Sequence, residues 1–228
     1  MIILQERDRE ILKFCYEQQF ITIEHVMLGF FEGRYKDASR RLGQLAQAKF
    51  LKEEDSGFLV SKQKFYRLTK LGRHAAESSC ANFIPQKRFL AHSTLMHDSF
   101  VSLVRIRLSE LWDATWIPES AAKKYELSEV PDGIVLFESG KQVAIEVENS
   151  IKGRQRFESR LHAWKNTQIT LVLYIATSEA LDSTLRSYLK SAPAKPHFGL
   201  TTWERLKSST PVLWSPNGSI QAFTRKKL

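Results

Sequence analysis

Three carboxylates in the second half of the chain have a spacing that suits the binding of a divalent cation. Residues 130–150 predict two strands joined by a tight turn, and Asp132 lies at the start of the first strand. In the second strand Glu146 and Glu148 alternate with apolar residues, so both carboxylates lie on one face of the hairpin. Asp132 can approach Glu146 from the neighbouring strand. Because Mg²⁺ prefers oxygen ligands, Asp132 and Glu146 are the candidate metal ligands.

A second interpretation fits the same pattern. Two carboxylates side by side on a strand repel each other unless a cation or a basic side chain neutralises them. In this interpretation the hairpin is an edge of the sheet with this face exposed to solvent, and Glu148 pairs with Lys141 or Lys152. The spacing favours neither interpretation over the other.

The same residues resemble the PD-(D/E)xK motif of restriction endonucleases. Asp132 follows a proline, and Glu146-Val147-Glu148 lies in an apolar strand. The resemblance implies that Asp132 and Glu146 hold Mg²⁺, and that the residue two positions further on helps to activate the attacking water. That residue is usually lysine and here is Glu148, as in some members of the superfamily, while Lys152 can reach the site from the following turn. The implied catalytic residues are therefore Asp132, Glu146, Glu148 and Lys152, and the departure at Glu148 leaves the activity open.

A longer series of motifs is similar to the replication-relaxation family of plasmid and mobile-element proteins. The motifs are Arg7-Asp8-x-x-Ile11-Leu12, Arg40-Arg41-Leu42-x-x-Leu45, Tyr66-Arg67-Leu68-Thr69-x-x-Gly72, His97 in the next helix, and Pro131-Asp132-Gly133 followed by Glu146-Val147-Glu148-x-Ser150-x-Lys152. Some members of this family resemble relaxases of mobilisable plasmids. A relaxase needs a tyrosine nucleophile, and Tyr16, Tyr35 and Tyr66 are the candidates, each with an ordinary packing or phosphate-contact role as its alternative.

The elements that hold the carboxylates follow from apolar periodicity. Apolar residues at helical spacing predict one helix over residues 95–111 and another over 154–165. The second helix carries Arg154, Arg156 and Arg160, which form either a contact surface for DNA phosphates or an ordinary solvated face. An apolar run typical of a central strand follows at 169–176, then a helix to Lys190 and a strand at 198–203. We expect residues 91–228 to form a restriction-endonuclease-like mixed sheet flanked by helices.

The first 77 residues have a different pattern, with three helices followed by a hairpin. The predicted helices cover 7–19, 23–30 and 35–49, and the predicted strands cover 50–52 and 64–68. This is the element order of a winged helix-turn-helix. Residues 78–90 show no clear period and contain a proline, which indicates a linker. The chain is therefore expected to be a two-domain α+β or α/β protein.

The third predicted helix would be the recognition helix of such a motif. Its polar face would enter the major groove and offer Arg40 and Arg41 to phosphates or guanine edges, and Gln44 to bases. The expected DNA-contacting residues are Arg34, Lys36, Arg40, Arg41, Gln44, Lys62, Lys64 and Arg67, the last three in or near the wing. The alternative is that these side chains form a solvated helix face, or that the motif contacts another protein.

The composition favours an intracellular protein with a polyanionic partner. The formal net charge is +9, which suits double-stranded DNA, and 43% hydrophobic residues exclude a disordered chain. Two cysteines, Cys15 and Cys80, are too few for a disulfide framework. No apolar run approaches the roughly 20 residues of a membrane span. We therefore expect a cytoplasmic protein without membrane contact, and a homodimer is a further expectation because winged helices often dimerise.

The sequence thus predicts a DNA-binding protein of a plasmid or mobile element and leaves its activity open. One hypothesis is a Mg²⁺-dependent endonuclease or relaxase that nicks or relaxes DNA. The other is a non-enzymatic regulator, or a replication or mobilisation accessory factor, whose nuclease fold is degenerate. A third class, a protein-interaction adaptor, predicts no measurable affinity for duplex DNA.

Overall fold

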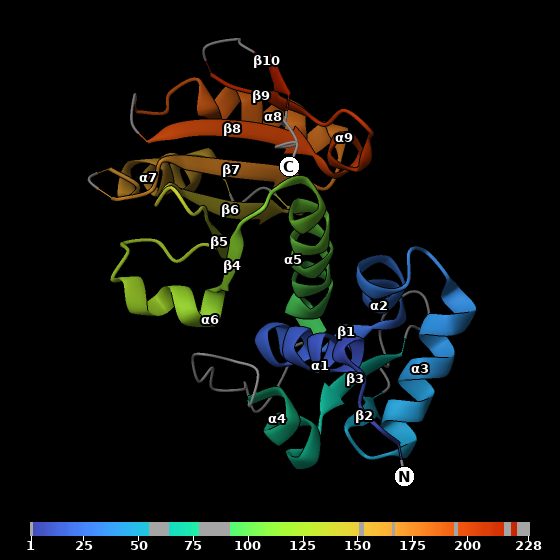
Figure 1. Ribbon diagram of the computed structural model, residues 1–228. Helices are drawn as coiled ribbons and strands as arrows, with labels where there is room; N and C mark the ends of the chain where they lie inside the picture. Colours follow the sequence, from blue (N-terminus) through green and yellow to red (C-terminus); the bar gives the residue numbers. More distant parts are fainter. Residues whose placement is uncertain are drawn as a thin grey trace. The chain divides into compact units, whose positions relative to one another are not determined.

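The computed structural model contains two compact units, Met1–Ile106 and Arg107–Leu228, and the division falls inside helix α5 (His92–Leu111). The structure describes residues 2–54, 64–77, 92–150, 153–165, 167–193, 196–216 and 220–222. Within these residues the first unit has a three-stranded sheet and the second a seven-stranded sheet, so the fold is mixed α and β (Figure 1). The expected linker at 78–90 lies outside the described residues. No helix of the described part has the length and apolar character of a membrane span.

The first unit has the element order that the sequence predicts. Its elements are α1 (Glu6–Gln18), β1 (Ile21–Thr22), α2 (Ile23–Phe30), α3 (Tyr35–Gln47), β2 (Leu51–Glu54), β3 (Phe65–Leu68) and α4 (Lys70–Glu77). Strands β2 and β3 form the expected antiparallel hairpin, and the sheet order is β1-β3-β2. Strand β1 was not predicted, because two residues are too few to show an alternating pattern. Apolar faces of the helices form the core, with Ile11, Leu12, Leu42 and Leu45 fully buried.

A buried histidine joins the start of α2 to α5 within this unit. Thr22 caps α2, and its hydroxyl accepts a hydrogen bond from the backbone N–H of His25 at 3.2 Å. His25 Nδ1 accepts the backbone N–H of Thr22 at 3.3 Å, so the proton is on Nε2, which lies 3.2 Å from the carbonyl oxygen of Ser99. Burial lowers the pKa of His25 to about 4. The imidazole is therefore neutral at pH 7.

The second unit is built on one sheet with strand order β10-β9-β8-β7-β6-β5-β4. Its strands are β4 (Thr115–Pro118), β5 (Gly133–Leu136), β6 (Gln142–Glu148), β7 (Leu171–Ala176), β8 (His197–Thr202), β9 (Val212–Trp214) and β10 (Ile220–Ala222). Strands β6, β7 and β8 are parallel, whereas the pairs toward both edges of the sheet are antiparallel. The predicted central strands are confirmed. The short outer strands β4, β9 and β10 were not predicted.

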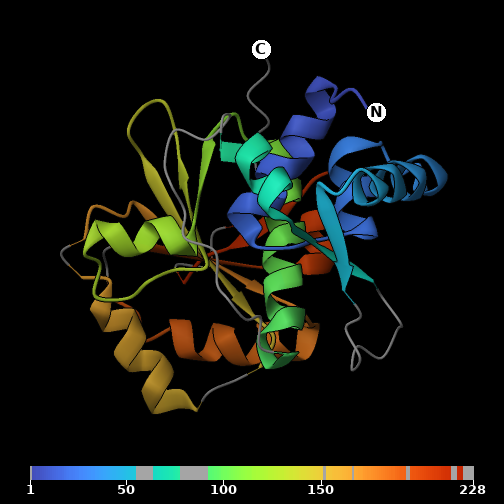
Figure 2. The same ribbon diagram turned by 90° about the horizontal axis from the view of Figure 1, so that it is seen from below.

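Helices α7 (Arg154–Ala163) and α8 (Glu179–Leu189) cover one face of this sheet (Figure 2). The shorter helices are α6 (Glu119–Ala122), η1 (Lys123–Tyr125) and α9 (Trp203–Lys207). Phe157 and Leu161 of α7 pack in the same buried cluster as Ala144 of β6 and Tyr174 of β7. Side chains two positions apart on a strand share a face. The face under α7 therefore also carries Glu146 and Glu148, the two glutamates of the predicted hairpin.

Candidate functional site

Helix α3 has one buried face and one exposed polar face. Its buried face carries Ala38, Leu42 and Leu45. Lys36, Arg40 and Gln44 are exposed and follow one another at intervals of four residues, so they form a single row along the helix. Gly43 is exposed beside this row, and a Cβ atom at that position would meet nothing within 4 Å. We call Lys36, Arg40, Gly43 and Gln44 the α3 polar row.

The charges at the start of the α3 polar row are accessible. The side chain of Arg40 is 71% exposed, and its Nη2 lies 2.8 Å from Asp37 Oδ1, one turn earlier. Arg34, which precedes the helix, lies 3.7 Å from Glu32 and 3.9 Å from Asp37. Exposed ion pairs of this kind contribute little free energy. Both arginines are thus able to exchange these partners for a phosphate.

Arg41 does not share the exposed face with Arg40, contrary to the expectation from sequence. Its Nε donates to Asp8 Oδ1 at 2.7 Å and its Nη2 to Asp8 Oδ2, and Asp8 is only 1% exposed. Asp8 Oδ2 also accepts the backbone N–H of Gln5 at 2.7 Å. The hydrogen bond to Asp8 raises the pKa of Arg41. Arg41 therefore joins α3 to the start of α1, and this role was not predictable from the sequence because the two partners are 33 positions apart.

A pocket of about 340 Å³ lies beside the α3 polar row. Its lining consists of Gln5, Arg7, Asp8, Phe31, Asp37, Arg40, Arg41 and Gln44. The guanidinium of Arg7 lies 4.6 Å from the centre of the Phe31 ring, a cation–π contact that holds it in place. Arg41 Nη1 donates to Gln44 Oε1 at 2.9 Å, which orients the Gln44 amide. Three arginines and an oriented amide thus surround a pocket at the exposed helix.

The wing residues are placed only in part. Lys64 is 59% exposed and lies 2.7 Å from Glu53 on the neighbouring strand. Arg67 is half-buried on β3. Lys62 lies outside the described residues.

The candidate tyrosine nucleophiles have different surroundings. Tyr16 is fully buried. Tyr66 donates to Glu53 Oε2 at 3.3 Å, and burial raises its pKa to about 12. Tyr35 is 58% exposed. Tyr16 and Tyr66 thus lack the accessibility that a nucleophile needs, and the raised pKa of Tyr66 makes its hydroxyl harder to ionise.

The second unit brings the three predicted carboxylates together. Strands β5 and β6 pair with Gly133 opposite Ile145, so Asp132 lies next to Glu146 across the hairpin. Asp132 Oδ2 accepts the backbone N–H of Val147 at 2.7 Å. Glu146 and Glu148 are only 3% and 7% exposed. The interpretation of this hairpin as an exposed edge is therefore wrong, and Lys152 lies outside the described residues.

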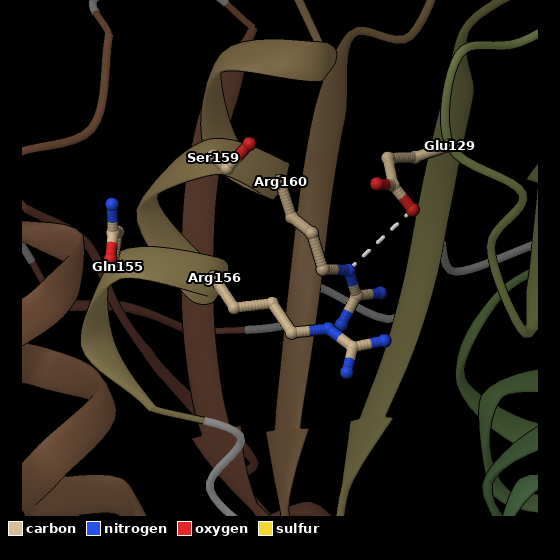
Figure 3. Close-up of a pocket in the computed structure, with 5 residues that line it drawn as sticks. All are labelled: Glu129, Gln155, Arg156, Ser159 and Arg160. Carbon is tan, nitrogen blue, oxygen red and sulfur yellow. Dashed lines mark ion pairs between the residues drawn. The ribbon is translucent and has the colours of Figure 1, made fainter.

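Arg160 neutralises these carboxylates from helix α7. Its Nη2 donates to Glu146 Oε2 at 2.8 Å and its Nη1 to Glu148 Oε1 at 3.1 Å. Its Nε lies 3.6 Å from Glu129 Oε2, the ion pair drawn in Figure 3. A basic side chain thus supplies the compensation that two adjacent strand carboxylates require. From the sequence, Arg160 was expected either to contact DNA phosphates or to lie on a solvated face, and its role against these carboxylates was not predicted.

Around Arg160 the number of carboxylates exceeds the number of guanidinium groups that bind them. Glu146 Oε1 is buried and has no hydrogen-bond partner within the described residues. Burial raises the pKa of Glu146 well above its usual value, Asp132 and Glu148 add to this effect, and Arg160 opposes it. Tyr174, the register partner of Glu146 on β7, is also buried, and burial raises its pKa. One guanidinium therefore faces more carboxylate charge than it can compensate.

The carboxylates as arranged fit a guanidinium rather than Mg²⁺. A magnesium ion needs carboxylate oxygens free to coordinate it at about 2.1 Å in near-octahedral geometry. Here one oxygen of each carboxylate already accepts a hydrogen bond, Glu146 Oε2 and Glu148 Oε1 from Arg160 and Asp132 Oδ2 from the backbone of Val147, and Glu146 Oε1 has no partner within the described residues. Among the described residues no group of three or more His, Cys, Asp or Glu side chains has the geometry to hold a metal ion.

A second pocket, of about 510 Å³, opens beside Arg160. Four of its lining residues, Gln155, Arg156, Ser159 and Arg160, come from α7, and Glu129 lies across from them (Figure 3). We call these five residues the α7 pocket. The packing of α7 on the sheet positions it, since Phe157 lies 5.1 Å from Tyr174, measured between ring centres.

Comparisons with known proteins give little further information. No protein-family model matches the sequence, and a search of curated proteins finds no match. A crystal structure of Bacillus subtilis PadR in complex with operator DNA is similar at 13% sequence identity and a TM-score of 0.24. The match covers 44% of this chain and 66% of that chain. A TM-score this low supports no argument, so the resemblance to the replication-relaxation family stays a prediction.

Proposed function

We propose that the first unit is a winged helix-turn-helix that binds double-stranded DNA through the α3 polar row. The element order α1, α2, α3, β2, β3 supports this assignment, since a helix in the position of α3 enters the major groove in such motifs. The observation that carries the proposal is the exposed row of Lys36, Arg40 and Gln44 beside an arginine-lined pocket.

Each residue of this surface has a distinct role in the proposed complex. Arg40 is long and accessible enough for a phosphate or a guanine edge, and the Gln44 amide suits an adenine. Arg41 acts indirectly, because its ion pair with Asp8 holds α3 against α1 and its Nη1 orients Gln44. Lys64 on the hairpin would contact the phosphate backbone.

The proposal is tested by DNA binding of the full chain. Fluorescence anisotropy with labelled duplexes, measured over a range of salt concentrations, compares the unaltered protein with a Lys36→Ala/Arg40→Ala variant. Both side chains are exposed, so the variant should fold normally. We expect weaker binding, and the slope of log K against log salt should become shallower by about 0.9 for each phosphate that the variant no longer neutralises. Lys190→Ala, which removes an exposed charge at the end of α8, is the control.

Two results would contradict the proposal. Unchanged affinity of the Lys36→Ala/Arg40→Ala variant for DNA would show that the α3 polar row does not contribute to binding. Absence of measurable affinity for duplex DNA at moderate salt removes DNA binding altogether and favours a protein-interaction adaptor.

We further propose that the second unit is a nuclease-like domain that does not cut DNA. The order β4, β5, β6, α7, β7 with Asp132 and Glu146 on the central hairpin supports the nuclease-like assignment. The ion pairs of Arg160 with Glu146 and Glu148 support the absence of catalysis, because the carboxylates are committed to a side chain. The whole chain would then be a DNA-binding regulator or accessory factor, with plasmid or mobile-element DNA as its target.

A second candidate function is Mg²⁺-dependent nicking, favoured by the placement of Asp132 opposite Glu146. The test incubates supercoiled plasmid with the unaltered protein, or with an Asp132→Ala variant, in Mg²⁺ or Mn²⁺. We expect no nicking that depends on Asp132. Nicking by the unaltered protein that the variant lacks would overturn the non-catalytic assignment.

A further inference from the structure

The α7 pocket contains a guanidinium of fixed orientation. Arg160 has five N–H bonds, and hydrogen bonds to Glu146 and Glu148 use two of them. Its Nε also lies 3.6 Å from Oε2 of Glu129, the acidic residue of the α7 pocket. Both glutamates are buried on a sheet strand, so Arg160 cannot turn away without leaving them uncompensated. Carboxylates at the base of the site therefore hold a cationic side chain at the wall of the pocket.

Arg156 adds a second positive charge to the same pocket. It is exposed, lies one helical turn before Arg160, and has no hydrogen bond or ion pair within the described residues. The contrast is Arg154 on the same helix, whose Nε donates to Glu158 at 2.8 Å. The first turn of α7 carries no acidic residue, although a helix N-terminus favours negative charge. Arg156 and the first turn of α7 therefore add positive charge at this end of the pocket, beside Arg160, which faces the carboxylates of Glu129, Glu146 and Glu148.

We propose that the α7 pocket binds a phosphate group of the backbone of duplex DNA, a proposal that rests on the proposed function. Arginine binds phosphate oxygens in a bidentate manner, and Arg156 beside the oriented Arg160 offers this geometry. Gln155 and Ser159 add uncharged hydrogen-bond donors, as is common at phosphate contacts. None of the described residues that line it has an aromatic or purely aliphatic side chain on which a base would stack. The pocket is thus suited to the phosphate rather than to a free nucleotide.

The experiment compares Arg156→Gln with Arg154→Gln in the full chain. Both changes remove one exposed charge from the same turn of α7, so non-specific charge effects are matched. The measurement is the affinity for several unrelated duplexes as a function of salt. We expect Arg156→Gln to weaken binding by the same factor for every sequence and to lower the salt slope by about 0.9. Arg154→Gln should leave the slope unchanged.

The outcomes separate this inference from the proposed function. If the unaltered chain does not bind duplex DNA, the proposed function itself has failed. If it binds and Lys36→Ala/Arg40→Ala weakens binding while Arg156→Gln and Arg154→Gln behave alike, only the phosphate pocket is overturned. A further arm measures melting temperature with inorganic phosphate and with AMP. Stabilisation that Arg156→Gln abolishes, without an effect of this variant on DNA binding, would assign the pocket to a free phosphate compound and overturn the proposal.

Discussion

Helices α3 and α7 use arginine in the same way in two different units. Each helix has one arginine bound to buried carboxylates, Arg41 in α3 and Arg160 in α7. Each also has a second, exposed arginine, Arg40 or Arg156, that lines the same pocket as the first. The arginine that binds buried carboxylates has a fixed position in the pocket wall, and the exposed arginine can contact another molecule.

The two sites differ in their charge balance. Arg41 faces a single buried carboxylate, Asp8, whose oxygens accept hydrogen bonds from Arg41 and from the chain at the start of α1. Arg160 faces Glu146 and Glu148 together, and Glu146 Oε1 has no partner within the described residues. In the first unit one guanidinium thus pairs with one carboxylate. The unmatched cluster makes the stability of the second unit depend on the protonation of Glu146.

The largest effect is expected from Arg41→Ala. This change leaves the charge of Asp8 buried and uncompensated, which costs about 3–5 kcal/mol of unfolding free energy. Urea unfolding followed by circular dichroism measures the decrease. Arg40→Ala is the matched control, because its exposed side chain should change stability by no more than about 0.5 kcal/mol. Equal stability of the two variants would show that the ion pair with Asp8 does not hold α3 in place.

A somewhat smaller effect is expected from acid in the first unit. His25 has its pKa lowered from 6.5 to about 4, which corresponds to about 3 kcal/mol. The folded state holds the neutral imidazole, so this stability is present above pH 6.5 and is lost as the pH falls through about 4. Urea unfolding at a series of pH values should show the decline, and His25→Gln should remove it. His74→Gln, at an exposed site, should keep the full decline.

The second unit should respond to pH in the opposite direction. The pKa of Glu146 is raised, mainly by burial, so the folded state takes up a proton more readily than the unfolded chain. Its contribution is present at low pH and is lost as the pH rises through the folded pKa. Glu146→Gln should therefore gain stability over the unaltered protein as the pH increases, by less than the effects above. Urea unfolding of both proteins over the same pH series measures this gain.

The control for this prediction is Glu129→Gln, which removes a more exposed partner of Arg160. Its stability relative to the unaltered protein should change little with pH. A difference between Glu146→Gln and the unaltered protein that stays constant with pH would mean that Glu146 is ionised throughout.

Local patterns predicted most of the elements but few of the contacts between them. Apolar periodicity indicated α1, α2 and α3, the β5–β6 hairpin and the central strand β7. It also placed Glu146 and Glu148 on one face, with Asp132 near the first. Alternation along a strand cannot tell an exposed face from one that a helix covers, and for this reason the burial of both glutamates was not predictable.

The partners of the arginines could not be predicted for a related reason. Arg40 and Arg41 are adjacent in sequence, yet a step of one residue on a helix turns the side chain by about 100°. Arg40 therefore reaches solvent and Arg41 reaches Asp8 on another helix. A pattern of residue types gives the direction of a side chain only when the packing of the helix is known.

Gly43 leaves a gap among the exposed side chains of α3. Glycine inside a helix costs up to about 1 kcal/mol relative to alanine, and in the folded chain there is open space where the methyl group of alanine would lie. The stability of the protein alone therefore does not explain why position 43 is glycine rather than alanine. Because Gly43 has no side chain, another molecule can come closer to the helix axis at this position than it could at a larger residue. Arg40 and Gln44 would then have a shorter distance to span to contact that molecule.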